Sequence, residues 1–475
     1  MREFLARISI SVVIVWLPIE TGCIHYTARP LNPPGIEDQY RTRSLNSPEL
    51  AAFVRLQPDK ASINWPPALL DLDNLTLVAY FYQPDLDVAR ARAAVAEAAV
   101  ITARQRVNPS ISGDAGYSKN PESAITYAVT PAFTIETAGK RGYRTMQAEK
   151  LAEGARLSFV EAGWQVRSRV RGAALAYLFA QRRLDVLRTE SGVREDLVEI
   201  FEKRRATGEA ATPDLDIVRA DLSATQVTMR LAEGEVAQSL SSLETACGLP
   251  PSSLTGITIT LSALEAPPSE QELPIRKIQR AGLLHRADVR RTLTEYAAAD
   301  ALLRLEIANQ YPNITLSPSY AFQEGFVDYT LGIGLSALPI LHRQQGPIAE
   351  AEAQRRQVET QFRALQSRAI GQMEEALRQY RAALAEWKEA DDKFLHVQQD
   401  REAAARTAMA AGEGDRLAVD VARLLTIAAG RTRLDALQRA QTALGALEDS
   451  MQHAFDGKQE PLGPSLSSPR VEAKR

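Results

Sequence analysis

The stretch that decides the fold is NQYPNITLSPSYAFQEGFVDYTLGIGLSALPIL, Asn309 to Leu341, because apolar and small polar residues alternate along it. Alternation with a period of two is typical of a β-strand with two different faces. One face of each arm carries the apolar residues Ile314, Leu316, Pro318, Tyr320 and Phe322, then Tyr329, Leu331, Ile333 and Leu335. The other face carries Thr, Ser, Gly and Ala, and the turn is predicted between Gln323 and Asp328.

The two arms have the length and pattern of strands that cross a membrane. Each has roughly ten residues, which is what a tilted strand needs to cross the hydrocarbon layer. One face is apolar and the other is small and hydroxylated. The pattern therefore predicts a membrane hairpin at about 312–339, with its polar face toward a wet interior.

A second stretch shows the same sorting at about 109–136. Ile111, Ala115 and Tyr117 alternate with polar residues after Asn108-Pro109, and a similar arm begins at Ile125. Pro109 and Pro312 lie 203 positions apart, and the Gly208-Glu209 and Gly412-Glu413 pairs lie 204 apart. Markers at one spacing indicate a duplicated unit of helix, β-hairpin, long helix, tight turn and long helix.

Long helices are predicted from about 141 to 206 and from about 345 to 411, with no proline beyond the first few positions. At about 1.5 Å per residue each could extend over roughly 90 to 100 Å. Apolar residues of the second helix recur at steps of three, four or seven, with one extra four-residue step between Ala369 and Leu377. This is coiled-coil spacing with a stutter. A soluble coiled-coil rod would explain these helices equally well, but it would not explain the hairpins.

Glycine breaks both helices and a restart signal follows each break, so each copy is predicted to fold back as a helical hairpin. The tips are predicted at about 207–214 and 411–416. Thr212-Pro213-Asp214 provides a cap, a proline and an early acid, and Gly414-Asp415 provides a similar cap.

The N-terminus has the layout of a bacterial secretory signal peptide, predicted at 1–22. Arg2 and Arg7 precede an apolar run from Ile8 to Leu17, which is too short for a membrane-spanning helix. Cys23 has two interpretations: the lipidated first residue of the mature chain, or an ordinary residue near a cleavage site. Thr21-Gly22-Cys23 fits a lipoprotein signal, although Glu20 stands where leucine is usual.

The remaining regions are assigned from composition and pattern. Residues 23–74 are Pro-rich and are predicted to be an extended leader with a short helix near Ser47 to Leu56. The two repeats are assigned to 75–248 and 281–456, a linker to 249–280, and a disordered tail to 457–475.

Composition argues against several functions. Of 475 residues, 45% are hydrophobic but only 6% aromatic, which indicates long alanine-rich helices, and a formal net charge of −3 argues against a nucleic-acid partner. With two cysteines no disulfide framework is available, and Cys247 is predicted to be a buried small hydrophobe. The histidines lack metal-ligand spacing and no phosphate-binding loop or nucleophile motif occurs, so neither an enzyme nor a cofactor is predicted.

Four strands per chain cannot close a barrel, and a membrane does not tolerate unpaired strand edges. Several subunits must therefore complete it, and three copies would give twelve strands, an even number within the bacterial range. Periodicity alone does not decide between two and three subunits.

The order of several short motifs, together with the duplication, resembles the TolC family of outer-membrane efflux proteins. They are Leu284-His285-Arg286-Ala287-Asp288-Val289-Arg290, Tyr311-Pro312-Asn313-Ile314, Leu338-Pro339-Ile340, Gly139-Lys140-Arg141 and a Gly-Glu at each tip. The resemblance extends from about Pro48 to Asp456, and Ala287 stands where the family usually has proline. It implies a mixed α/β membrane protein, a homotrimer whose twelve-stranded outer-membrane barrel continues into a periplasmic helical tunnel. The implied partners are a membrane-fusion adaptor, an inner-membrane pump and outer-membrane lipid.

The resemblance also implies that the helix tips form the adaptor contact and the closing aperture. The matching residues here are Gly208, Glu209, Thr212, Asp214, Asp216, Gly412, Glu413, Asp415, Arg416 and Asp420. The competing interpretation is that Asp214 and Asp415 only start helices, while Arg416 and Asp420 form a weak surface pair.

The predicted function is a passive exit duct of a tripartite efflux system. The alternatives are the outer-membrane component of a type I protein secretion system and a periplasmic coiled-coil scaffold. Metal ions, drugs, solvents and polypeptides all remain open as substrates.

Overall fold

The computed structural model describes residues 26–57, 60, 64–117, 119, 125–273, 283, 285–323, 326–336 and 342–455. The predictions for the signal peptide, Cys23, Leu338-Pro339-Ile340 and the tail lie outside these residues. The chain divides into two compact units, Met1–Arg43 and Ser44–Arg475. The described residues of the first unit include the helix α2 (Pro33–Arg41), where the sequence pattern predicted only irregular chain. The Asn32 side chain caps it, and prolines occupy its first positions.

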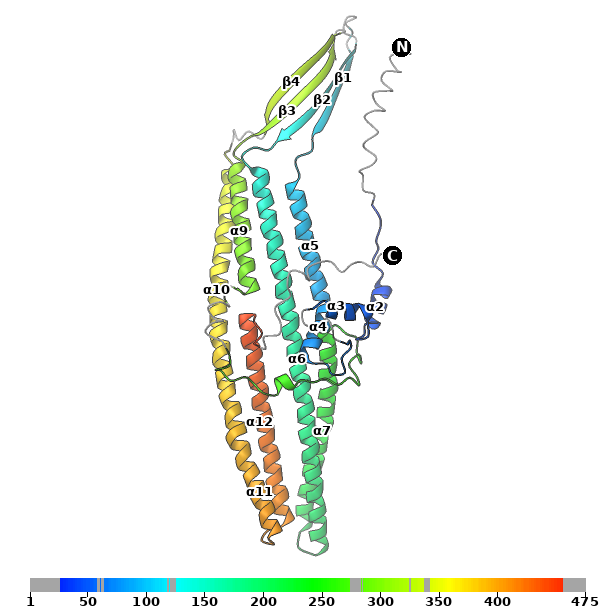
Figure 1. Ribbon diagram of the computed structural model, residues 1–475, viewed down its shortest axis with the longest axis vertical. Helices are drawn as coiled ribbons and strands as arrows, with labels where there is room; N and C mark the ends of the chain where they lie inside the picture. Colours follow the sequence, from blue (N-terminus) through cyan, green and yellow to red (C-terminus); the bar gives the residue numbers. More distant parts are fainter. Residues whose placement is uncertain are drawn as a thin grey trace. The chain divides into compact units, whose positions relative to one another are not determined.

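The second unit consists of long helices and one sheet (Figure 1). Its described helices are α3 (Pro48–Arg55), α4 (Leu72–Tyr82), α5 (Pro84–Arg104), α6 (Lys140–Ala206), α7 (Thr212–Ala246), η1 (Ser262–Leu264), α9 (Ala287–Ala308), α10 (Gln345–Lys388), η2 (Glu389–Leu395), α11 (His396–Ala410) and α12 (Arg416–Met451). None of the helices in the described part of the chain combines the length and apolar character that crossing a membrane requires.

The sheet has four antiparallel strands in the order β1 (Ser110–Tyr117), β2 (Ile125–Ile135), β3 (Asn313–Gln323) and β4 (Phe326–Ser336). The two hairpins come from the two repeats and pair through β2 and β3, where Ile135 faces Ile314 and Tyr127 faces Phe322. Among the described residues, the outer edges of β1 and β4 have no strand partner.

The strand register keeps the predicted apolar and polar faces continuous across the sheet. Leu316 lies opposite both Phe133 of β2 and Ile333 of β4, so apolar residues meet on one face of three strands. The rings of Tyr127 and Phe322 stack with centroids 5.1 Å apart on the same face. On the other face the hydroxyls of Thr130 and Ser319 lie 2.8 Å apart. The sheet is therefore amphipathic as a whole.

The two long helical runs differ in regularity. α6 is an unbroken helix of 67 residues, whereas the matching run in the second repeat contains a seven-residue π-helical segment, η2, between α10 and α11. The prediction of an uninterrupted α-helix to about 411 is wrong at this segment. A π turn is wider than an α turn and rotates the residues that follow it. Phe394 within η2 and Val397 just after it continue the apolar spacing of the second helix, and they are 44% and 60% exposed.

Apolar packing holds each helical hairpin together. Leu184 and Leu187 of α6 pack with Ala232 of α7, and Leu377 and Tyr380 belong to a buried cluster that α10 shares with α12. A larger core forms around α4, α6 and the segment that follows α7, and it includes Cys247. Burial raises the pKa of the Cys247 thiol to about 12, and the predicted burial of this residue is confirmed.

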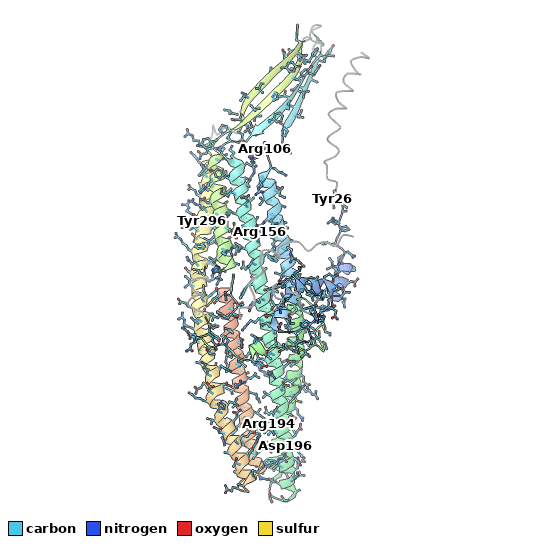
Figure 2. The ribbon with its side chains drawn as sticks, in the orientation of Figure 1. Tyr26, Arg106, Arg156, Arg194, Asp196 and Tyr296 are labelled. Atoms are coloured by element: carbon cyan, nitrogen blue, oxygen red, sulfur yellow. The ribbon has the colours of Figure 1, made fainter. Side chains whose placement is uncertain are left out.

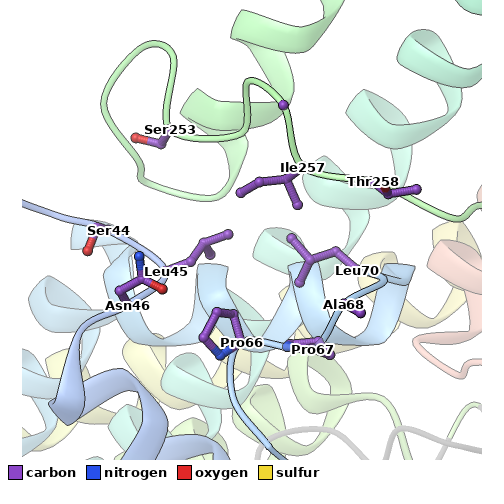
Figure 3. Close-up of a pocket in the computed structure, with 11 residues that line it drawn as sticks. Ser44, Leu45, Asn46, Pro66, Pro67, Ala68, Leu70, Ser253, Ile257 and Thr258 are labelled. Carbon is purple, nitrogen blue, oxygen red and sulfur yellow. The ribbon is translucent and has the colours of Figure 1, made fainter.

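The linker segment packs midway along the helices rather than hanging free. Leu249, Leu254 and Leu261 are buried, and Ile259 forms an isolated parallel β-bridge with Leu70. A pocket of about 390 Å³ lies beside this bridge, lined in part by Pro66, Pro67 and Thr258 (Figure 3).

The contact between the repeats, where α6 meets α12, is rich in polar groups. Arg167 Nη1 lies 3.2 Å from Glu448 Oε2, and Arg171 donates to the carbonyl of Gln441 at 3.0 Å. All four side chains are buried. Arg171 crosses α12 at Gly445, where an added Cβ would overlap the Arg171 guanidinium. Buried charges of this kind are tolerated because they are paired and hydrogen-bonded.

Candidate functional site at the helix tips

The first tip closes α6 with a left-handed glycine. Gly208 has φ of 81°, and its N–H donates to the carbonyl of Arg205 at 3.1 Å. The N–H of Glu209 donates to the carbonyl of Arg204 at 2.8 Å. Glycine is favoured there because side chains with a Cβ rarely adopt a positive φ.

The second tip repeats this geometry. Gly412 has φ of 78°, its N–H donates to the carbonyl of Met409 at 3.1 Å, and Glu413 donates to Ala408 at 2.9 Å. The two copies of the duplicated unit therefore have the same backbone conformation at their tips.

The two helices that leave the tips start differently. Asp415 caps α12, because its Oδ1 accepts the N–H of Ala418 at 2.9 Å. In the first copy Thr212 is already the first residue of α7, so its predicted role as the cap is wrong by one residue. Proline is tolerated in the first turn, which allows the helix to start before Pro213. Asp214 stabilises this start by accepting the N–H of Ala211 at 3.2 Å.

Two ion pairs join the tip regions of the two helical hairpins. Arg204 of α6 lies 2.5 Å from Asp415 Oδ2, and Arg416 of α12 lies 2.8 Å from Asp196 of α6. Figure 2 labels Asp196 near the tip end of the helices. The four side chains are 33% to 53% exposed, so each pair contributes modestly. In one pair the arginine comes from α6 and in the other it comes from α12. Together the two pairs favour one position of the start of α12 against α6.

The electrostatic state of Asp415 fits its two contacts. The pKa of its carboxyl is lowered, chiefly by the backbone N–H of Ala418 and also by the Arg204 guanidinium. It is therefore ionised at neutral pH, the form that both contacts require.

Asp420 is buried, with only 5% of its surface exposed, and the interpretation of Arg416 and Asp420 as a surface pair is wrong. Asp420 lies beside Val419 and Ala422 on the buried part of α12. Its Oδ2 is 3.7 Å from Arg416 Nε and accepts no hydrogen bond from the described residues. Burial, with a smaller effect of Asp196, raises its pKa. Asp420, in the second turn of α12, therefore has a carboxyl oxygen that is buried without a hydrogen-bond donor among the described residues.

The other predicted acids project into solvent. Glu209, Asp216 and Glu413 are exposed, and no ion pair involves them within the described ranges. Conversely, sequence reasoning missed Asp196 and Arg204, which each pair with a residue more than 200 positions away. The basic run Lys203-Arg204-Arg205 at the end of α6 was the available signal, but only the packing of α6 on α12 reveals its partner.

Among the described residues, no group of three or more His, Cys, Asp or Glu side chains could hold a metal ion. The arrangement at the tips can thus act through ion pairs, helix caps and the position of α12.

A family model matches part of the chain. Residues 82–249 match the family model described as outer membrane efflux protein. No curated protein matches the chain in sequence.

Solved outer-membrane channels share the fold. The outer membrane protein VceC of Vibrio cholerae is 19% identical with a TM-score of 0.65, over 81% of this chain and 96% of its own. The Campylobacter jejuni CmeC channel is 14% identical with a TM-score of 0.65, over 82% and 87%. The Neisseria gonorrhoeae MtrE channel in its open state is 15% identical with a TM-score of 0.64, over 83% and 94%. The chain therefore shares the fold of these outer-membrane channels, and its residues 82–249 match the outer membrane efflux protein model.

Proposed function

We propose that this chain is the outer-membrane exit duct of a tripartite efflux system, passing substrates passively from an inner-membrane pump to the exterior. The observation that carries the proposal is the amphipathic four-stranded sheet at one end of long helical hairpins in one unit (Figure 1). An apolar face suits lipid, and a Thr, Ser and Gly face suits a water-filled lumen. The localisation that follows is the outer membrane, with the helices extending into the periplasm.

Three chains would complete the membrane barrel. The free edges of β1 and β4 are the two edges that one subunit can offer to its neighbours, and strand edges in a membrane must be paired. A homotrimer would close twelve strands into a ring with cyclic symmetry.

The helix tips would be the adaptor-docking and aperture region. Glu209, Asp216 and Glu413 are exposed there and free to meet a partner, while Arg204, Asp415, Arg416 and Asp196 hold the two hairpins together. Around a threefold axis the exposed acids Glu209, Asp216 and Glu413 would repeat as a ring of negative charge that attracts cations.

The test is expression of the full chain in a Gram-negative host, membrane fractionation, and gel electrophoresis with and without boiling. We expect the protein in the outer-membrane fraction as a heat-sensitive trimer band that forms pores in planar bilayers. A wholly soluble monomer would overturn the proposal.

A further inference from the structure

We propose that three exposed arginines, Arg106, Arg141 and Arg343, form a collar that binds the phosphate groups of phospholipids in the periplasmic leaflet of the outer membrane. This inference rests on the proposed function, because it requires the sheet to lie in the membrane. It assigns a lipid-headgroup contact to residues where the sheet joins the helices.

The three collar residues lie where strands and helices meet: Arg106 and Arg343 in short connections, and Arg141 in the first turn of α6. Arg106 stands between the end of α5 at Arg104 and the start of β1 at Ser110. Arg141 is the second residue of α6, which begins shortly after β2 ends, and Arg343 precedes the start of α10. Each is exposed. Figure 2 labels Arg106 at the border between the sheet and the helices.

The apolar surface of the sheet reaches this border. Ile111, Ile135 and Leu335 near this end of the strands are 73%, 48% and 55% exposed. Tyr311, just before β3, is 58% exposed. Tyrosine and arginine gather at the level of lipid headgroups, where an apolar body and a polar end are both accommodated. Within a few positions the exposed residues therefore change from apolar ones, which suit the hydrocarbon layer, to tyrosine and arginine, which suit the headgroup layer.

The charges at the border leave the collar arginines available. Glu136 pairs with Arg144, Glu149 pairs with Arg104, and Glu306 accepts from Asn309. The first turns of α6 and α10 contain no acidic residue that would repel a phosphate.

Within the described part of the chain, no carboxylate pairs with Arg106, Arg141 or Arg343. Exposed arginines farther from the sheet commonly have partners, as Arg156 has Glu97 and Arg219 has Glu202. A guanidinium matches the geometry of phosphate oxygens, so a phosphodiester fits the collar better than a neutral partner.

Lys140, next to Arg141, is a basic residue with a structural role. It is buried, and its Nζ donates to the carbonyl of Tyr311 at 2.6 Å and to Asn313 Oδ1 at 2.7 Å. It ties the start of α6 to the start of β3. Lys140 therefore fixes the backbone that presents the collar and takes no part in binding lipid.

The test compares lipid binding to detergent-solubilised full-length protein by native mass spectrometry, with dioleoylphosphatidylglycerol as the probe and dioleoylphosphatidylcholine as the reference. The wild type should prefer the anionic lipid. The variant R106Q/R141Q/R343Q should bind it at least about fivefold more weakly, since one arginine near an anionic surface has an effect of this size. The matched control R205Q/R290Q/R401Q removes three exposed arginines away from the sheet and should bind as the wild type does.

Unchanged phosphatidylglycerol binding by the collar variant, or an equal loss in the control, would overturn the collar. If the triple variant does not form trimers, the single variants R106Q, R141Q and R343Q replace it, and an absence of loss in all three is equally contradictory. Trimer bands and pores are recorded for the same preparations. A wild type that forms neither refutes the proposed function, whereas trimeric, pore-forming variants with wild-type lipid binding refute the collar alone.

Discussion

The two ion pairs between the helical hairpins should hold the tip closed, and neutralising them from the α6 side should open it. The variant Arg204→Gln/Asp196→Asn removes both pairs while leaving Asp415, which caps α12, unchanged. Exposed pairs contribute about 0.2 to 1 kcal/mol each. Because 1.4 kcal/mol is a tenfold change, losing both should shift the balance toward the open tip about 2- to 30-fold.

The assay is closed-state conductance of the trimer in planar bilayers, at low salt and at about 1 M salt. We expect the variant to conduct more at low salt and the difference to shrink at high salt, where exposed charges are screened. The matched control Arg230→Gln/Glu233→Gln removes an exposed pair within α7 without changing the net charge or the contact between hairpins. Wild-type conductance in the variant, or an equal increase in the control, would refute this reasoning.

Three further substitutions test separate parts of the structure. Asp420→Asn should stabilise the closed tip at pH 7 and lower the conductance, because the pKa of Asp420 is higher in the folded than in the unfolded chain and its ionised form therefore opposes burial. The difference in conductance from the wild type should vanish as the pH drops below the Asp420 pKa. Gly445→Ala should displace the buried Arg171 and lower trimer stability by about 1–3 kcal/mol in a heat-dissociation assay, whereas Gly430→Ala, with open space at its Cβ, should not; equal melting of both would contradict the packing argument. Lys140→Met should lower the dissociation temperature because two half-buried acceptors, the Tyr311 carbonyl and Asn313 Oδ1, lose their donor, while Arg141→Met should leave it unchanged; no loss in Lys140→Met would remove its role at the junction.

The strands and the duplication could be predicted because they depend on local patterns. Period-two alternation places Leu316 and Ile333 on one face wherever the strands pair, and the observed register places them directly opposite each other. The glycines at both tips were predictable because a helix that reverses direction commonly ends in a left-handed residue. These features need no knowledge of distant contacts.

The parts that sequence reasoning missed depend on packing between distant segments. The π-helical segment η2 carries no composition signal, and Asp391 within it pairs with Arg433 of α12. The burial of Asp420 and the partners of Arg204 and Asp196 arise where α12 meets other helices. Helix α2 was missed because its caps, Asn32 and two prolines, resemble the signals of an irregular segment.

The most direct test of the central claim is the water accessibility of β3 in the assembled protein. Single cysteines are placed at Thr315, Ser317 and Ser319 on the polar face, and at Ile314, Leu316 and Tyr320 on the apolar face. Trimers in lipid vesicles are treated with a membrane-impermeant maleimide, beside the parent chain. The account predicts labelling with a period of two, in which the polar-face positions react and the apolar-face positions are protected by lipid. Equal labelling of both faces would contradict a strand that separates lipid from a water-filled duct.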